Sequence, residues 1–205
     1  MGSIDGKEAA LFLLRWVHLI AGVIWIGHLY FFNFVQGNFE KTLDGETKKK
    51  VVPELRPRAL WWFRWGAMFT MLAGVGMIGL LYQGKMGELA HEDRGQWITF
   101  GAGLGMIMWF NVWFIIWPAQ KNIIGWIKKG EKPAEFDGTV ARAGKFSRIN
   151  TYLSMPMLFG MGAGSGHFPS LQCNWVSLPI VLVIGAVIAW HFIWKVGPAV
   201  GKFEG

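Results

Sequence analysis

The chain has 205 residues, of which 53% are hydrophobic and 16% aromatic, and only 16% are charged, against roughly 25% in an ordinary soluble domain. This composition excludes a soluble globular domain and indicates a protein that crosses a membrane several times. The formal net charge of +7 is accompanied by no nucleic-acid-binding motif, so we attribute it to membrane topology and to anionic lipid headgroups and expect no nucleic-acid partner.

Five stretches each approach or exceed the ~20 residues that a helix needs to cross a ~30 Å hydrocarbon core. Each is expected to be a transmembrane helix, because only helices and closed barrels satisfy the backbone in lipid and these stretches lack the alternation of barrel strands. The first is too long for a signal-peptide core, so we expect it to be retained. The fold class is therefore all-α, a polytopic membrane helix bundle forming one integral-membrane domain over residues 1–205, with spans at 9–35, 60–83, 96–118, 149–167 and 176–196.

Positive charge gathers in two of the connections between these spans. The 36–59 and 119–148 segments hold most of the lysines and arginines between spans, and such segments remain on the cytoplasmic side of a membrane. The sequence therefore predicts an external amino terminus, a cytoplasmic carboxyl terminus, and external connections at 84–95 and 168–175. The one cysteine, Cys173, lies in the last of these and has no internal partner for a disulfide.

Four of the five histidines, His18, His28, His167 and His191, lie in or at the end of the predicted spans. Ionisable side chains inside a membrane are costly and usually functional. A rise of ~1.5 Å per residue puts His18 about 14 Å, His191 about 22 Å and His28 about 28 Å below the outer surface, with His167 near that surface. An outer pair, His18 with His167, and an inner pair, His28 with His191, would each suit bis-histidine ligation of haem b, giving one haem or two.

Neighbouring residues favour a haem over isolated packing histidines. Gly22 lies one turn after His18, and a glycine-rich run, 159–166, precedes His167, which would leave room for a flat macrocycle. Arg15 and Arg64 lie near the outer and inner faces, where propionates would emerge. Two plainer interpretations stay open: the glycines let helices approach each other, and the arginines reach lipid phosphates.

Other metal-binding patterns are weaker. Glu88, His91 and Glu92 have a spacing that would suit a surface metal if their loop were helical, but His91 is expected to be solvated. Methionines on one span would suit copper, although methionine more often fills irregular packing; they are Met155, Met157 and Met161. Intramembrane polar residues are expected to form interhelical hydrogen bonds; they are Asn33, Thr70, Asn111, Asn150 and Ser154.

Several motifs resemble the membrane part of the bacterial urate oxidase (urate hydroxylase) family. They are Leu-Arg-Trp-Val-His-Leu-Ile-Ala-Gly-Val-Ile-Trp-Ile-Gly at 14–27, Trp-Phe-Arg-Trp at 62–65, Asn-Val-Trp-Phe-Ile-Ile-Trp-Pro-Ala-Gln-Lys at 111–121, and Asn-Thr-Tyr-Leu-Ser-Met-Pro at 150–156 running on to His-Phe-Pro at 167–169.

The resemblance implies a location in the bacterial inner membrane and electron transfer to a c-type haem, which that family usually carries on a following cytochrome domain. This sequence contains no Cys-x-x-Cys-His, so the c-type haem is expected on a partner subunit. Of the proposed ligands, His18 and His167 match the family pattern, whereas the inner pair, His28 and His191, rests on depth alone.

The sequence thus predicts a haem-b-binding electron-transfer subunit of a respiratory or oxidoreductase assembly, with a c-type cytochrome or other membrane subunits as partners. Two alternatives remain: a urate hydroxylase-like membrane oxidase, which would need a substrate pocket near Arg15 or Asn150, and a haem-free structural subunit in which the histidines join helices.

Overall fold

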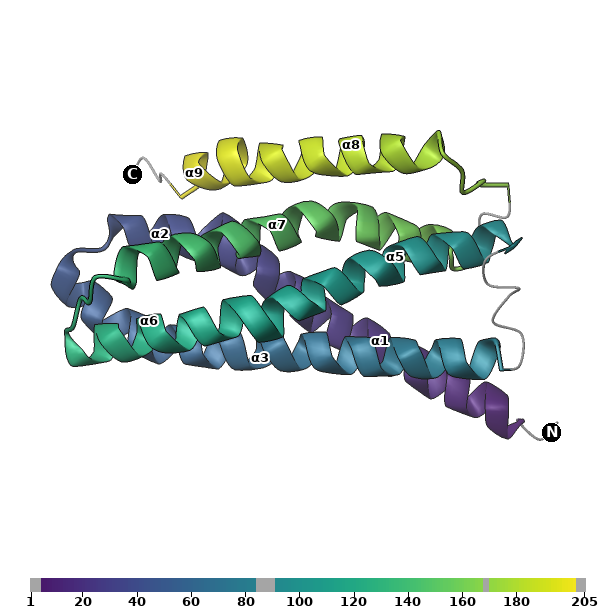
Figure 1. Cartoon of the computed structure of the whole chain (residues 1–205), viewed down its shortest axis with the longest axis horizontal. Helices are drawn as coiled ribbons and strands as arrows, with labels where there is room; N and C mark the ends of the chain where they lie inside the picture. The colour runs from purple at the N-terminus through teal and green to yellow at the C-terminus, as the bar shows by residue number, and fades with distance from the viewer. Residues whose placement is uncertain (1–4, 84–90, 168–169, 202–205) are drawn as a thin grey trace.

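The structure is a computed structural model that describes residues 5–83, 91–167 and 170–201. Over these residues it contains helices and no strand, which confirms the all-α class. Three of the helices continue through a π-helical segment into a further α-helix, so the chain forms five long helical rods (Figure 1). They are α1–η1–α2 (Gly6–Tyr30, Phe31–Gln36, Gly37–Thr42), α3 (Gly45–Leu81), α5–η2–α6 (Asp93–Phe110, Asn111–Ile116, Trp117–Lys129), α7 (Phe136–Ala163), and α8–η3–α9 (Ser177–His191, Phe192–Val196, Gly197–Ala199).

Four of the rods are long and apolar enough to cross a membrane: Gly6–Thr42, Gly45–Leu81, Asp93–Lys129 and Ser177–Ala199. They contain or overlap four of the five predicted spans. The remaining prediction, 149–167, coincides with the second half of α7, which ends at Ala163. The first half of α7 carries Asp137, Arg142, Lys145 and Arg148, so its apolar part is shorter than the ~20 residues of a full span.

The expected connections 36–59 and 119–148 are mostly helical, which corrects the boundaries read from hydropathy. Asp44 caps α3, accepting hydrogen bonds from the backbone N–H groups of Glu46 and Thr47, both at 2.9 Å. The α6 helix ends at Gly130, whose φ of 72° is the left-handed conformation that favours glycine. The turns at this end are therefore short, and the rods extend beyond their apolar parts.

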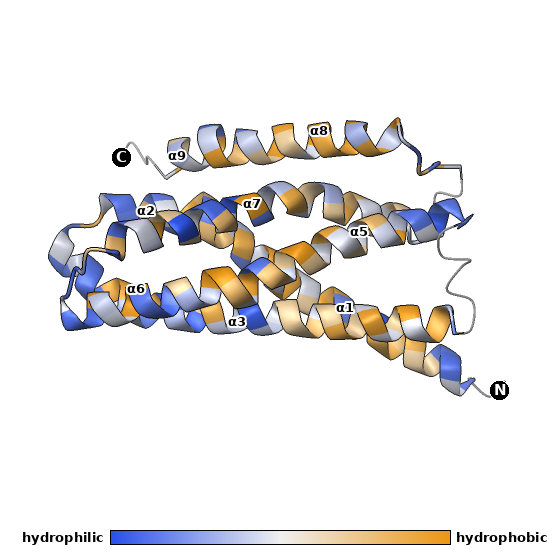
Figure 2. Cartoon of the chain, viewed as in Figure 1, coloured by the Kyte–Doolittle hydropathy of each residue, from blue (hydrophilic) through white to orange (hydrophobic). Residues whose placement is uncertain are grey.

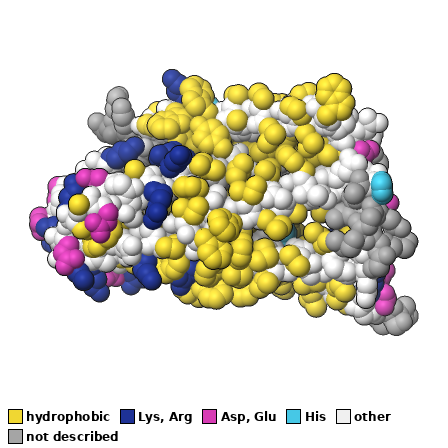
Figure 3. Space-filling view, viewed as in Figure 1, with side chains coloured by type: hydrophobic (Ala, Val, Ile, Leu, Met, Phe, Trp, Pro, Cys, Tyr) yellow, Lys and Arg dark blue, Asp and Glu magenta, His cyan; other side chains and the backbone are white. Residues whose placement is uncertain are grey.

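Polarity divides the bundle along its length. Apolar residues dominate the half that holds most of α1, α5 and α8, and hydrophilic residues dominate the end where α2 meets α3 and α6 meets α7 (Figure 2). In the space-filling view, a belt of hydrophobic side chains is bordered by lysines and arginines, beyond which acidic and basic residues mix (Figure 3). This arrangement is that of a helical membrane bundle with one strongly charged end, called the charged end below.

The interior is held by close helix contacts and by buried amides. The main core cluster joins Trp25 and Leu29 of α1 to Phe63 of α3 and Met108 of α5. Asn111 donates to Asn150 Oδ1 at 2.8 Å, and Asn150 donates to the Met108 carbonyl at 3.0 Å.

Other predicted interhelical hydrogen bonds are also present. Asn33 donates to Ser147 Oγ at 2.8 Å, and Ser154 Oγ lies 3.0 Å from Tyr30 Oη. Thr70 is the exception, since its hydroxyl donates to the Gly66 carbonyl within α3. A threonine hydroxyl in a helix readily reaches the carbonyl four residues earlier.

Candidate functional site

His18 lies on the face of α1 that packs against α3. Its Nδ1 is 2.8 Å from the Thr70 carbonyl oxygen. Because a carbonyl oxygen only accepts, Nδ1 carries the proton, and in the neutral imidazole the lone pair is on Nε2. A second group that fixes the tautomer in this way is the usual companion of a metal-binding histidine. The contact thus leaves Nε2 available for a ligand.

Two glycines make room around this imidazole. A Cβ built on Gly74 of α3 would lie 3.1 Å from His18 Cε1, and one built on Gly22 of α1 would touch the Thr70 side chain at 3.9 Å. Any larger residue at position 74 would push the ring of His18 away from its place against α3. Gly22 therefore lies beside Thr70, the partner of His18, and its expected role in leaving room for a macrocycle stays a prediction.

His28 lies on α1 as well, ten residues after His18 and nearly three helical turns deeper, and it repeats the same local chemistry. Its Nδ1 lies 2.7 Å from the Ile24 carbonyl of its own helix, so its Nε2 is also free of this bond. The ring lines a shallow groove between α1 and α3, together with Arg58 and Trp62. His28 therefore faces α3, as His18 does.

The other two histidines are exposed at the ends of their helices. His167 follows the end of α7, with Nδ1 2.9 Å from Ser165 Oγ. His191 ends α8, where its ring lies 6.0 Å from that of Phe192. The η3 segment that follows meets η1 through Phe192 and Phe34, with ring centroids 5.6 Å apart. His191 is thus near the level of Phe34 along the bundle. His28, by contrast, lies on the face of α1 that packs against α3.

Within the described residues, no hydrogen bond or ring contact joins one of the four histidines to another. His18 and Gly22 both lie against Thr70. The pairing of His18 with His167, and that of His28 with His191, stay predictions. No group of three or more His, Cys, Asp or Glu side chains among those residues is placed to hold a metal ion. Glu88 of the weaker surface pattern lies outside them.

The two arginines differ in their surroundings. Arg15 is exposed on α1. Arg64 of α3 has its guanidinium carbon 3.9 Å from the ring centroid of Trp117 and 5.9 Å from that of Trp113. Arg64 therefore stacks on α6 and η2, whereas His28 lines the groove between α1 and α3. Its Nε is buried without a hydrogen-bond partner.

Sequence reasoning missed Thr70 and Gly74 as the neighbours of His18. Thr70 was recognised only as a polar residue within a span. The sequence does hold a signal for this pair: a threonine stands four residues before a glycine in 70–74. In a helix antiparallel to α1, these two residues would lie at the level of His18.

A family model described as Urate oxidase N-terminal matches residues 87–199, more than half of the chain. The chain belongs to this family. The match contains the 111–121 and 150–156 motifs and both His167 and His191, while the 14–27 and 62–65 motifs lie before it. Comparison with curated proteins gave no match, and comparison with solved structures gave none.

Proposed function

We propose that this member of the Urate oxidase N-terminal family binds haem b and relays electrons within a membrane oxidoreductase assembly. The observation that carries the proposal is the bond between His18 Nδ1 and the Thr70 carbonyl, because it presents a neutral imidazole with a free Nε2 inside an apolar helix pair. Family membership supports the oxidoreductase context.

The residues around His18 fit a haem ligand. Thr70 fixes the tautomer and the ring plane, Gly74 leaves space beside Cε1, and Gly22 keeps the neighbouring face of α1 small. A histidine that only joins two helices needs no more than the hydrogen bond to Thr70. Gly74 in addition lets the ring stay in one orientation, which suits a histidine that binds iron.

His167 is the second histidine that would hold the iron, and Arg15 is the residue that would pair with a propionate at the same face. His167 lies at the exposed end of α7, with Gly164, Ser165 and Gly166 before it. Ser165 Oγ lies 2.9 Å from His167 Nδ1, so Nε2 is free of this contact. The inner pair, His28 and His191, with Arg64 nearby in depth, is the site proposed for a second haem, and only His28 has its Nδ1 bonded to a backbone carbonyl.

Bound haem b would supply one-electron redox chemistry. The chain itself would hold the iron by imidazoles, exclude water with the apolar faces of α1 and α3, and set the potential through burial. The proposed electron partner is a c-type cytochrome on another subunit, and the proposed location is the bacterial inner membrane. An assembly of this kind fits the lipid-facing belt of the bundle (Figure 3).

A urate hydroxylase-like oxidase is the second candidate, and the family match is the observation that favours it. Its substrate pocket was expected near Arg15 or Asn150. Asn150 is fully buried, and its amide is engaged by Asn111 and the Met108 carbonyl. Arg15 is exposed on α1, which leaves it as the more accessible of the two for a substrate.

An absorption spectrum of the purified chain tests both candidates against a haem-free subunit. We expect a low-spin haem b spectrum; a folded chain that takes up no haem when haemin is supplied would contradict both. Adding urate anaerobically to the oxidised haem form then separates them. Reduction of the haem by urate supports the oxidase, whereas reduction only by a chemical reductant supports the electron-relay subunit.

A further inference from the structure

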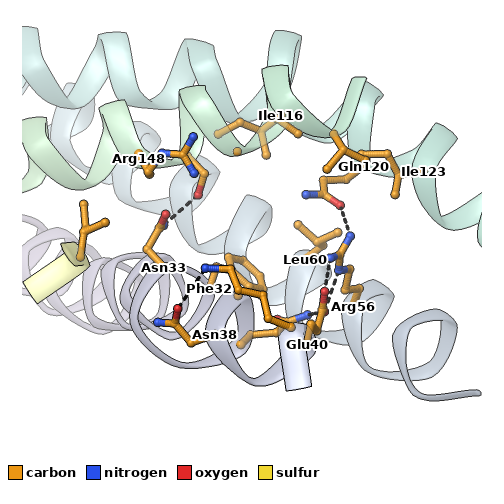
Figure 4. Close-up of a pocket in the computed structure, with 18 of the residues that line it drawn as sticks. Phe32, Asn33, Asn38, Glu40, Arg56, Leu60, Ile116, Gln120, Ile123 and Arg148 are labelled. Carbon is orange, nitrogen blue, oxygen red and sulfur yellow. Dashed lines mark hydrogen bonds and ion pairs between the residues drawn. The ribbon is translucent and has the colours of Figure 1, made fainter. Parts of the chain in front are cut away.

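A polar cavity lies at the charged end, away from His18. Its volume is about 260 Å³, and residues of all five rods line it. Figure 4 shows Asn33 and Arg148 at one end of the cavity and Glu40, Arg56 and Gln120 at the other. Phe32, Leu60, Ile116 and Ile123 add apolar surface. A concave site with apolar walls and a few converging polar groups is typical of small-molecule binding.

All three π-helical segments meet at this cavity. Asn33 and Gln36 come from η1, Ile116 from η2, and Trp194 from η3. A π-helical turn interrupts the regular hydrogen bonding of a helix and occurs frequently at functional sites. Three rods thus depart from α-helical geometry at one level, and each turns side chains into the same space.

The Glu40 carboxylate is already neutralised. Arg56 donates to it through both Nε, at 3.0 Å from Oε1, and Nη2, and Arg56 Nη1 donates to Gln120 Oε1 at 3.2 Å. Because Gln120 uses its oxygen for this bond, its amide N–H groups are left to donate elsewhere. Glu40 therefore needs no further cation as a partner.

Gln36 leaves an acceptor without a partner. Its amide nitrogen donates to Glu40 Oε1 at 2.6 Å, which fixes the orientation of the amide because a carboxylate only accepts. Gln36 is 4% exposed, and its Oε1 is buried without a hydrogen bond. A buried acceptor without a hydrogen bond costs free energy. A ligand N–H or O–H would satisfy it.

Arg148 supplies positive charge that no acid neutralises. Its guanidinium carbon lies 5.8 Å from the Trp194 ring centroid, and no acidic partner for it is present among the described residues. Lys41 also lines the cavity and donates to Asn38 Oδ1 at 3.3 Å. With Glu40 committed to Arg56, the cavity carries an excess of positive charge.

We propose that this cavity binds a small organic anion that also carries an N–H or O–H donor. The anionic group meets Arg148, the donor meets Gln36 Oε1, and the apolar walls hold the body of the molecule. The volume exceeds that of a single water, and a water alone would leave the Arg148 charge unmatched. A soluble metabolite and the headgroup of an anionic lipid such as phosphatidylglycerol share this chemistry.

Two probes that differ by one hydroxyl group test the proposal: 4-hydroxybenzoate and benzoate, titrated calorimetrically against the full chain in phosphatidylcholine nanodiscs. We expect 4-hydroxybenzoate to bind about tenfold more tightly, the effect of one hydrogen bond to a buried acceptor. Gln36→Met should remove this preference. Arg148→Met should weaken both probes about tenfold, while Lys145→Met, an exposed charge outside the cavity lining, should change neither.

Equal binding of the two probes to the wild type, or unchanged binding to Arg148→Met, would overturn the proposal. The lipid source is tested by repeating the titration in phosphatidylglycerol nanodiscs and by mass spectrometry of lipids that copurify with the chain. Weaker probe binding there, with phosphatidylglycerol enriched on the wild type over Arg148→Met, assigns the site to the headgroup; unchanged binding assigns it to a soluble anion. Absence of both probe binding and lipid enrichment also overturns the proposal.

Discussion

The α1–α3 pair and the α5–α7–α8 region use their polar side chains differently. In the first, His18 and His28 each have Nδ1 at a backbone carbonyl, so each retains a free Nε2. In the second, the buried polar groups of Asn111 and Asn150 are bonded to each other and to the backbone, and the two histidines are exposed. The comparison shows that the histidines of the first region use only one ring nitrogen in these bonds, whereas the buried amides of the second region bond to each other and to the backbone.

The family match lies over the second of these regions. Residues 87–199 cover α5 to α9, where glycines bring the helices close. A Cβ on Gly160 would lie 3.1 Å from the Trp97 carbonyl oxygen, and one on Gly101 would lie 3.2 Å from the Met157 carbonyl oxygen. The proposed outer haem would take one ligand from each region, so its loss should be the most sensitive test of the comparison.

The largest effect is expected at His18. His18→Ala and His167→Ala should each convert the low-spin haem signal to high spin, because removing one imidazole opens a coordination position on the iron. His28→Ala is the matched control on the same helix and should keep the outer signal. Electron paramagnetic resonance of the three variants measures this. A His167 variant with the full low-spin signal would remove His167 from the ligand set.

Haem stoichiometry by pyridine haemochrome assay sharpens the comparison between the outer and inner pairs. A value near one haem per chain, unchanged by His28→Ala or His191→Ala, would leave the inner pair as packing residues. A value near two, falling to one in both variants, would establish the inner site. A fall in only one of the variants would show that these histidines are not partners.

Topology gives an all-or-none result. In a Cys173→Ser background, Lys49→Cys in the charged α3 segment should react with an impermeant maleimide only after the cells are opened, because lysine-rich segments stay cytoplasmic. Asp5→Cys, on the expected outer side, is the control and should react in intact cells. Both positions are exposed, so access to the side chain does not limit the reaction. Labelling of Lys49→Cys from outside would reverse the assigned orientation.

Asn150→Ala should lower the free energy of unfolding by about 1–2 kcal/mol, since it leaves the side-chain amide of Asn111 unpaired in a buried site and removes one hydrogen bond to the Met108 carbonyl. Asn122→Ala, an exposed amide on α6, is the control and should change stability little. Reversible unfolding in mixed micelles provides the measurement. Equal stability of the two variants would mean that the amide pair does not hold α5–η2 to α7.

The smallest expected effect concerns Cys173. Burial, followed by the negative charge of Asp93, raises the pKa of its thiol, so the thiolate fraction at neutral pH falls below that of an ordinary cysteine. Alkylation by iodoacetamide should therefore accelerate only at more alkaline pH. Asp93→Asn should move the rate profile to lower pH, with an exposed Ser170→Cys in a Cys173→Ser chain as the reference. Profiles that coincide would contradict this account of the thiol.

Hydropathy predicted where the helices are but not where they end. Four of the five predicted spans fall in helices that are long and apolar enough to cross a membrane. Their ends differ, however, since α3 begins at Gly45, well before the span expected from Leu60. Its charged first part contains Pro53 and Pro57 and is still helical, which no apolar pattern indicates. Packing of this part, including the Arg56–Glu40 ion pair, overrides local propensity.

The sequence indicated which residue types form the candidate site around His18, but not which residues contact each other there. His18 is an obvious candidate because it is ionisable in an apolar span. Its partner Thr70 is 52 residues away in the chain, so their meeting depends on the register of α1 against α3. The three π-helical segments carry no sequence signature that we recognise, and with them the polar cavity around Gln36 was missed.

Absorption spectra of the purified wild-type chain and of His18→Ala decide whether His18 holds haem b. We expect a low-spin haem b spectrum in the wild type and its loss in the variant, with both chains equally helical by circular dichroism. An identical haem spectrum in the two chains, or no haem in a folded wild type supplied with haemin, would contradict it.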